Sequence, residues 1–464
     1  MLRISDTRTL VCLPLVTVLW LCATTMFAQG TDPYPNAITN KLIYQETPMV
    51  SPPVNMPFHD PDFGSPMVRA TDETTNFVHP GTYLRTAASG EANEWSVDAK
   101  KFYVVGEGDV ELAFGFNPST MAISSLPGAT PGRGLQLPLR AGSAFSFVDP
   151  DFIYGTTNRT PLTITGYRFS TATSSTVIDT TTCATQPPLV QGKGHAVVSD
   201  DDITLSAEDN RIVISEGGPA SGGHPFVIVY DKQLGCRWYN TQTGQIGGWG
   251  TTGTVSIPDR YLIRHTSISG SGKYVRIQVG YFGFYVWDLE TLNVVPCQVN
   301  SGLVCGGYGT NGYNSYVNAA GRVDQMNTLL RPFDNLSDYR QLVYPLPLPH
   351  HWGQDKHYVW TDAVGNSDDS LPVCASTYNY EGDTEIDAPY DGEILCIETD
   401  GLASTVWRFA HNRAIWVTPF FNTQPLGNMT PDGRNFLFTS GWDGQLGNDG
   451  AGKPRSDVWI VRLD

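Results

Sequence analysis

A polar turn followed by an alternating strand recurs along the chain, and this recurrence limits the fold more than any other feature of the sequence. In NMTPDGRNFLFTSGWDG (428–444), Asp432 and Gly433 form a pair that favours the tight turn between antiparallel strands. The same shape returns in six further segments, at 94–108, 145–157, 205–217, 266–280, 315–326 and 350–362. Seven copies of a unit that cannot bury its apolar face alone indicate a repeat architecture.

Most copies are followed by a second alternation of apolar and aromatic residues. These segments are FVIVYDKQLG (226–235), GFYVWDLETLN (283–293), GEILCIETDG (392–401) and SDVWIVRLD (456–464). A period of two is typical of a half-buried strand. A charged fraction of 16%, with 47 Gly and 32 Pro, also suits many short strands joined by turns. We predict an all-β, seven-bladed β-propeller, with two separate β-sandwiches as the alternative.

The two ends of the repeat region complement each other. The strand at 456–464 has no later strand to pair with, and GSPMVRATD (64–72) is predicted to pair with it and close the ring. We therefore expect a single propeller domain at 57–464, preceded by an N-terminal extension at 30–56.

The first residues are typical of an exported protein. Arg3 and Arg8 precede an apolar run that ends near Cys22, and small residues follow up to Ala28. We predict a secretory signal peptide of the bacterial type at 1–29. The apolar run is short for a membrane span, although an uncleaved anchor is the alternative. The mature protein is expected to be secreted or periplasmic, with no membrane span after cleavage.

The charge of the chain limits its partners. The formal net charge is −17 and the sequence pI is about 4.8. Nucleic-acid binding needs a basic surface, so this class of partner is excluded. We expect an extracellular polysaccharide or an envelope protein as the partner, and a monomeric chain.

Six cysteines follow the predicted signal peptide, an even number that indicates disulfides in an oxidising compartment. We favour the pairs Cys297–Cys305, Cys374–Cys396 and Cys183–Cys236, out of fifteen connectivities that six cysteines allow. A thiolate zinc site is the alternative, but no C-x-x-C pair is present.

TPDGRNFLFTS (430–440), followed by DVWIVRLD (457–464), resembles the repeat of TolB-type propellers, a group that includes oligogalacturonate-lyase-like propellers. The resemblance covers about residues 60–464 and specifies a blade rather than a reaction. It implies that the innermost strand of each blade runs along a central channel into its turn. Ligands would then bind at the opposite rim, six to nine residues before each turn.

Counting back from the turns gives the candidate rim residues. We expect substrate-binding roles for Asn93, Glu94, Arg264, Asn314 and His351, and a wider rim with His265, His350 and Gln424. His357 follows its predicted turn, on the second strand, and is expected to point away from the end of the blade where His350 and His351 lie. In FAHNRAIW (409–416), His411 is expected to contact substrate and Arg413 to clamp a carboxylate. A polar loop between blades with a structural arginine is the alternative for that segment.

The same resemblance implies a divalent metal held by His and Gln side chains at the channel mouth. His265, His350 and Gln424 would be its ligands, and such donors suit manganese. Ordinary hydrogen-bonded histidines are the alternative. Two acidic segments, 199–209 and 382–393, gather carboxylates as a calcium loop does, but neither has EF-hand spacing and a solvated loop is favoured.

The sequence leaves two classes of function open. The first is a non-catalytic propeller that binds carbohydrate or a protein partner at the central funnel. The second is a polysaccharide lyase or hydrolase at the same place. A uronate lyase needs a cation for the substrate carboxylate and a base for the neighbouring proton. For these roles we predict the catalytic set of His265, His350 and Arg413. A hydrolase needs two carboxylates, and Glu94 is the only one expected at the rim.

Overall fold

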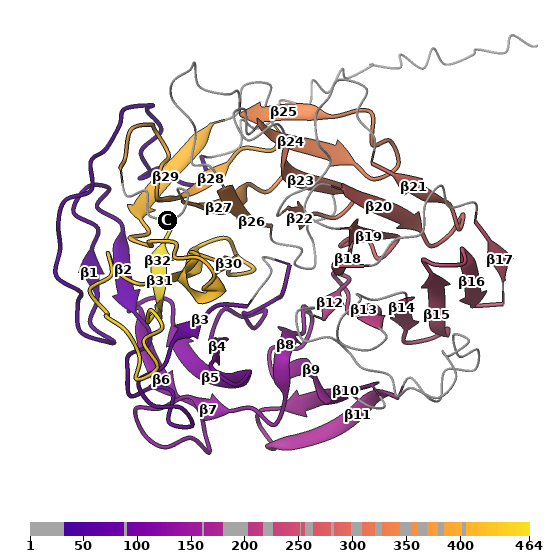
Figure 1. Cartoon of the computed structure of the whole chain (residues 1–464), viewed down its shortest axis with the longest axis horizontal. Helices are drawn as coiled ribbons and strands as arrows, with labels where there is room; N and C mark the ends of the chain where they lie inside the picture. Colours follow the sequence, from indigo (N-terminus) through magenta and orange to yellow (C-terminus); the bar gives the residue numbers. More distant parts are fainter. Residues whose placement is uncertain are drawn as a thin grey trace, which may run out of the picture.

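The computed structural model describes residues 32–87, 91–159, 162–179, 203–216, 226–250, 252–255, 263–279, 283–297, 309–320, 327–343, 355–360, 369–378, 385–400 and 405–464. Within these residues the chain forms seven antiparallel sheets arranged in a ring (Figure 1). Each sheet is one blade, so the predicted all-β, seven-bladed propeller is confirmed. The only helix among the described residues is the 3-10 turn η2 (Phe421–Thr423), and none of their helices is long and apolar enough to cross a membrane.

The first three blades follow one another along the chain. Blade 1 contains β3 (Leu84–Arg85), β4 (Lys101–Gly106), β5 (Val110–Asn117), β6 (Ala122–Ser125) and β7 (Leu135–Gln136). Blade 2 contains β8 (Arg140–Phe145), β9 (Phe152–Arg159), β10 (Leu162–Arg168) and β11 (Thr173–Asp179). Blade 3 contains β12 (Thr204–Leu205), β13 (Arg211–Glu216), β14 (Phe226–Asp231), β15 (Gly235–Asn240), β16 (Gln245–Gly248) and β17 (Gly253–Thr254).

The remaining blades complete the ring. Blade 4 contains β18 (His265–Ile268), β19 (Tyr274–Val279), β20 (Gly283–Asp288) and β21 (Val294–Pro296). Blade 5 contains β22 (Thr310–Asn311), β23 (Ser315–Ala320), β24 (Asn327–Pro332) and β25 (Arg340–Val343). Blade 6 contains β26 (Asp355–Val359), β27 (Val373–Tyr378), β28 (Glu393–Ile397) and β29 (Val406–His411). Blade 7 contains β30 (Gly427–Met429), β31 (Asn435–Ser440), β32 (Asp457–Arg462), β2 (Pro66–Arg69) and β1 (Phe58–His59).

The hydrophobic core lies between the blades rather than in one central mass. All five residues of β28 are buried, as are the first five of β32, because both faces of a blade pack against neighbouring sheets. Aromatic rings fill these interfaces, and Trp442 stacks on Trp459 with ring centroids 4.0 Å apart. The high aromatic content of the sequence is therefore used largely for packing between sheets.

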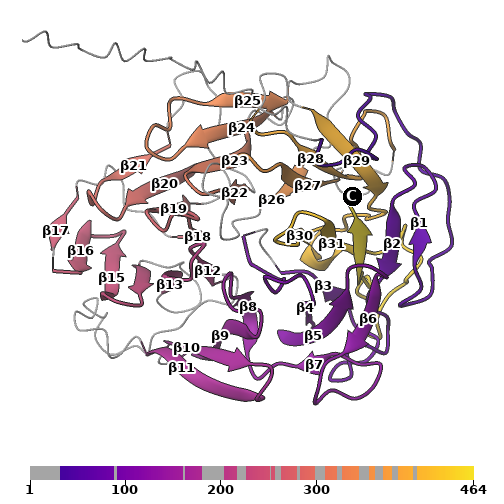
Figure 2. The ribbon, with the colours of Figure 1, turned by 180° about the vertical axis from the view of Figure 1, so that it is seen from behind.

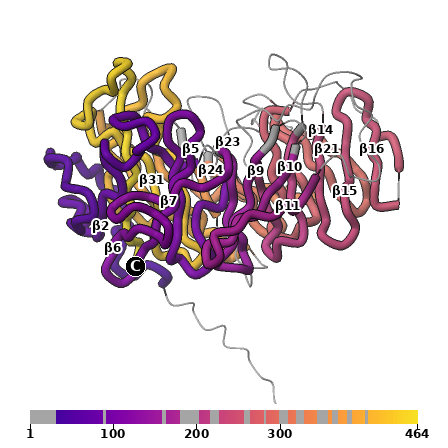
Figure 3. Tube along the Cα trace, turned by 90° about the horizontal axis from the view of Figure 1, so that it is seen from below, coloured from indigo at the N-terminus to yellow at the C-terminus, as the bar shows by residue number. Residues whose placement is uncertain are grey.

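The ring closes as the sequence predicts. Strand β2 pairs with β32 in antiparallel register, with Met67 opposite Val461 and Val68 opposite Ile460. Arg69 at the end of β2 forms a buried ion pair with Asp457 of β32. The N-terminal and C-terminal strands consequently share blade 7, where indigo and yellow segments lie side by side in Figure 3.

The N-terminal extension forms a strap across this closure. Ile38 pairs with Arg408 of blade 6, and Val54 pairs with Arg69 of blade 7. The Asn55 side chain then donates to the carbonyl of Ile123 in blade 1. Residues 38–55, which we call the strap, thus connect three consecutive blades along their outer edges.

Two of the seven predicted repeats are out of register. Segment 315–326 was expected to begin with an innermost strand, but β23 is the second strand of blade 5 and β22 precedes it. Segment 350–362 was expected to hold a hairpin turn, but β26 (Asp355–Val359) is itself the innermost strand of blade 6. The turn between β22 and β23 of blade 5 lies at Gly312–Asn314, ahead of the segment in which the turn was predicted.

One predicted disulfide is present among the described residues. Cys374 and Cys396 occupy opposite positions on β27 and β28 and are bonded. Cys236 and Cys297 are each disulfide-bonded as well. Their predicted partners, Cys183 and Cys305, lie outside the described residues, so those two pairings stay predictions.

Candidate functional site

A buried cluster of charged side chains joins opposite sides of the ring. Glu91 comes from the segment between β3 and β4, which reaches into the centre of the ring in Figures 1 and 2. Its Oε2 lies 2.6 Å from Nε2 of His265, the first residue of β18. Its Oε1 accepts a hydrogen bond from the Arg276 guanidinium on β19. Blade 1 therefore contacts blade 4 across the channel.

The surroundings of this cluster hold its charges in place. The Glu91 and Arg276 side chains are only 4% and 2% exposed. Arg276 also donates from Nε to Ser267, 3.2 Å away, and its guanidinium lies 4.7 Å from the Tyr316 ring centroid. Burial alone would raise the pKa of Glu91, but Arg276 and the hydrogen bond from His265 hold it below its ordinary value. Glu91 is therefore ionised at neutral pH.

His265 differs from its two partners because its side chain keeps 12% of its surface exposed. The carboxylate of Glu91 fixes the orientation of the ring and stabilises the imidazolium that forms when His265 takes up a proton. A carboxylate and a histidine in this relation can bind an acidic group or act as a general base.

A small pocket lies next to this cluster. Glu91, Asn93, Thr310, Val359 and Met429, with their neighbours, line a space of about 20 Å³. A space of this size has room for about one water molecule.

The predicted rim residues of blade 1 are mainly structural. The Asn93 amide donates to the carbonyl of Phe145 at 2.8 Å, which joins blade 1 to blade 2. Glu94 is 1% exposed and accepts a hydrogen bond from the amide of Ala87 at 2.7 Å. Both side chains are buried and engaged within the protein.

Other predicted residues take different positions. Arg264 directly precedes β18 beside His265, as expected, and its amide donates to Gln278. Asn314 lies in the turn between β22 and β23, at the opposite end of the innermost strand from the predicted rim. His350 and His351 lie outside the described residues, and their predicted roles stay predictions.

Arg413 lies at the outer edge of the ring, not at the funnel as predicted. Its side chain is fully buried and contacts Glu46 of the strap at 3.0 Å and Asp443 at 3.1 Å. It also donates to the carbonyl of Thr47 and lies over the Trp442 ring. Burial raises the pKa of Glu46 to about 8, although Arg413 opposes this. Arg413 does clamp carboxylates, but they belong to its own chain.

Comparison of the fold with solved structures finds clear matches, whereas comparison of the sequence with known proteins does not. No protein-family model matches the chain, and the search of curated proteins finds no match. An oligogalacturonate lyase from Vibrio parahaemolyticus superposes with a TM-score of 0.53 and 12% identity, over 88% of this chain and 96% of that one. An oligogalacturonate lyase solved in complex with manganese gives a TM-score of 0.54 and 13% identity, over 92% and 98% of the two chains. This chain shares the fold of those lyases.

The oligogalacturonate-lyase-like fold raises the question of whether a metal site is present. Nε2 of the predicted ligand His265 is bonded to Glu91, and the predicted ligand Gln424 lies against His357. The third predicted ligand, His350, lies outside the described residues. The predicted set of three ligands therefore stays a prediction, and we derive no step through a metal.

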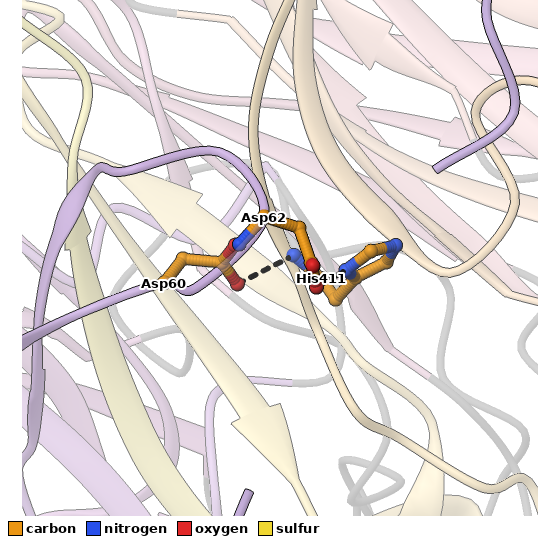
Figure 4. Close-up of side chains that lie close together, drawn as sticks. All are labelled: Asp60, Asp62 and His411. Atoms are coloured by element: carbon orange, nitrogen blue, oxygen red, sulfur yellow. Dashed lines mark hydrogen bonds and ion pairs between the residues drawn. The ribbon is translucent and has the colours of Figure 1, made fainter. Parts of the chain in front are cut away.

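A different group, Asp60, Asp62 and His411, places potential ligand atoms within 4.8 Å of one another (Figure 4). Their donors and acceptors are already used. Asp60 accepts from the amide of His411 at 3.2 Å, Asp62 accepts from both the amide and the hydroxyl of Thr47, and the His411 ring contacts Asp62 and the carbonyl of Tyr44. His411 ends β29, the outermost strand of blade 6, whereas Asp60 and Asp62 follow β1 of blade 7, and the three residues together hold the strap in place. His411 was expected at the funnel and is instead part of this attachment.

His357 was expected on the second strand of its blade, but it lies on the innermost strand of blade 6 and is only 2% exposed. Its Nε2 lies 3.3 Å from the Tyr378 hydroxyl, and the two rings stack. Burial lowers the pKa of His357 to about 3, although Gln424 opposes the shift. The ring is therefore neutral in the folded protein at physiological pH.

This burial predicts acid lability. Because the folded pKa of His357 lies below its unfolded value of 6.5, its contribution to stability is complete above pH 6.5 and is lost as the pH falls towards 3. We expect the free energy of unfolding to fall by about 1.4 kcal/mol per pH unit from this group alone. Denaturant unfolding of the wild type and of His357→Gln at pH 7, 6 and 5 should show a shallower pH slope in the variant. His59→Gln, at an exposed position, is the control, and equal slopes in all three proteins would contradict the assignment.

Proposed function

We propose that the protein binds a carbohydrate at the channel mouth where Arg264 and His265 lie. The observation that carries this proposal is the 2.6 Å contact between Glu91 and His265, in which a buried carboxylate orients a partly exposed imidazole. Polar groups converging at the mouth of a concavity are the usual basis of a binding site.

An acidic sugar is the ligand class that these side chains suit best. The chain carries a net charge of −17, so it repels polyanions at long range. An acidic ligand would therefore depend on local cations, and Arg264 and a protonated His265 supply them. An envelope protein that presents acidic groups is the other partner class for the same mouth.

The proposal includes the location of the protein. The bonded pair Cys374–Cys396 supports folding in an oxidising compartment. Together with the predicted signal peptide at 1–29, this favours a secreted or periplasmic protein in a bacterium.

The Glu91–His265 contact also favours a second candidate function, uronate lyase activity. His265 would remove the proton from the carbon next to the sugar carboxylate, and Glu91 would stabilise the resulting imidazolium. The electron pair of the broken C–H bond then forms a carbon–carbon double bond as the glycosidic oxygen leaves. Arg264 would neutralise the substrate carboxylate. The fold shared with oligogalacturonate lyase supports this candidate without deciding it.

One experiment tests both candidates. The purified protein is titrated with acidic and neutral oligosaccharides by calorimetry, while absorbance reports any unsaturated uronide. We expect Arg264→Ala and His265→Gln each to weaken binding about ten-fold or more, the effect of losing a charged hydrogen bond. Arg434→Ala removes a cation that is 66% exposed, in the β30–β31 turn at the opposite end of the channel, and should change nothing. If Arg264→Ala and His265→Gln both bind the sugar as the wild type does, the proposed site is rejected. Formation of an unsaturated uronide would favour the lyase.

A further inference from the structure

A second cavity lies on the opposite face of the ring, between blades 3 and 4. It measures about 270 Å³ and is bordered by hairpin turns of blades 3, 4 and 5. The turn after β18 contributes Ser271 and Lys273, whereas His265 begins the same strand. A four-residue strand separates the two positions by about 13 Å, so this cavity is distinct from the proposed channel-mouth site.

Hydrogen bonds between the turns build the cavity as a fixed structure. The amide of Ala207 in blade 3 donates to Gly270 in blade 4, and Ser271 donates to Tyr313 in blade 5. Arg211 of blade 3 donates to the carbonyl of Gly272 at 2.7 Å. Because hydrogen bonds connect the turns of three blades here, the cavity walls are ordered before a ligand binds. This lowers the entropic cost of binding.

The lining excludes two ligand classes. Among the described residues that line the cavity, Tyr313 is the only aromatic residue and none is aliphatic, so an apolar ligand would gain little from them. The charged residues of the lining comprise three cations and three carboxylates, listed as Arg211, Lys232, Lys273, Glu208, Asp231 and Glu290. Their charges sum to zero, so an ion of either sign is not favoured.

The charged groups are moreover engaged with partners. Arg211 pairs with Asp231 at 2.9 Å, and Lys273 pairs with Glu290 at 3.2 Å. Glu208 accepts a hydrogen bond from Asn210 at 2.7 Å. The cavity therefore presents closely spaced hydrogen-bond donors and acceptors to a ligand, with one aromatic residue, Tyr313, at its border.

We propose that this cavity binds one neutral sugar unit. A sugar ring presents hydroxyl groups, which act as both donors and acceptors, and an apolar face that packs on an aromatic ring. Tyr313 supplies that ring, and Gln233 and Ser271 supply uncharged polar groups. The volume lies at the lower end of the range for small-molecule sites, about 300 Å³, which suits one unit rather than a chain.

The site goes beyond the proposed function, because it would give the protein a second, independent contact with carbohydrate. A ligand that displays neutral and acidic sugars could then engage both faces of the ring. No part of the second site depends on Glu91 or His265.

The test uses saturation-transfer NMR and titration of the full chain with glucose, galactose, mannose and cellobiose. We expect saturable binding of at least one of them, weakened about five- to ten-fold in Tyr313→Ala, as loss of an aromatic contact implies. Tyr313→Phe should keep most of the affinity because the ring remains. Gln233→Ala, at an exposed position, provides a second variant if Tyr313→Ala does not fold.

Leu234→Ala is the matched control, because Leu234 lies in the same turn as Gln233, is 59% exposed and does not line the cavity. Binding should be unchanged in this variant and in His265→Gln. Neutral-sugar binding that is lost in His265→Gln but kept in Tyr313→Ala would assign the sugar to the channel mouth and overturn the inference. Absence of saturable binding by all four sugars would overturn it as well, without affecting the test of the channel mouth with acidic sugars.

Discussion

Replacing Glu91 with glutamine is expected to lower the free energy of unfolding by about 3 to 5 kcal/mol, the usual result of removing one partner from a buried ion pair. The Arg276 side chain, 2% exposed, would keep its charge without a carboxylate to balance it. The His265 ring would also lose a charged acceptor at 2.6 Å. Chemical denaturation at pH 7, followed by fluorescence and circular dichroism, measures the change.

A double-mutant cycle separates the ion pair from a general loss of packing. In Glu91→Gln with Arg276→Met no unpaired buried charge remains, so the double variant should be more stable than Glu91→Gln alone. Glu107→Gln provides the matched control, because Glu107 pairs with Lys453 at 2.8 Å but both side chains are partly exposed. That change should cost less than about 1 kcal/mol. If Glu91→Gln and Glu107→Gln lowered the free energy of unfolding equally, the Glu91 cluster would not be a stabilising connection between blades 1 and 4.

The fold could be predicted because its signals are local. Each hairpin can be recognised within about fifteen residues, from a turn and from apolar residues at every second position. Strands β14, β20, β28 and β32 all lie where the second alternation was found. The closure was predictable as well, since β32 is the last strand of the repeat region and β2 has a matching pattern. The predicted positions of the strands were wrong where turn-like composition and strand formation occurred in the same residues. In blade 6 the polar run before His357 has the composition of a turn, yet β26 starts within it.

The candidate site could be predicted only in part, because its contacts are not local. His265 and Arg264 were found by counting back from a correctly placed turn. Glu91 was missed, and its two partners lie 174 and 185 residues away along the chain. No periodicity or spacing connects residues at that distance when they meet across a ring. The neighbouring Asn93 and Glu94 were selected instead, because the count from the turn defines a position only to within a few residues.

Arg413 and His411 show the opposite error. Their polar side chains between two apolar runs suggested an exposed loop, and in an isolated blade that interpretation would be reasonable. The strap covers them, and Glu46 and Asp62 supply the acidic partners that a ligand was expected to bring. Composition can show that a segment is polar, but it does not show which distant segment of the chain will neutralise it.

Removing residues 32–72 is expected to abolish cooperative folding, because the deletion opens the ring. Met67 and Val68 are completely buried in blade 7, and their loss alone would cost about 3 to 6 kcal/mol. The deletion also leaves Asp457 without Arg69, its partner in a buried ion pair. The unpaired edge of β32 would then be free to join other chains, so we expect aggregation in size-exclusion chromatography.

A rearranged chain distinguishes ring closure from the mere presence of the strap. Because Met67 lies opposite Val461, residues 65–72 can follow Asp464 through a short glycine-containing linker and form a hairpin with β32. This variant lacks the strap but restores the closing strand, so it should be monomeric and unfold cooperatively, although less stably than the full chain. A deletion variant as stable as the wild type would show that the first and last strands do not need each other. If only chains that retain residues 38–55 fold, the strap closes the ring and the β2–β32 pairing is secondary.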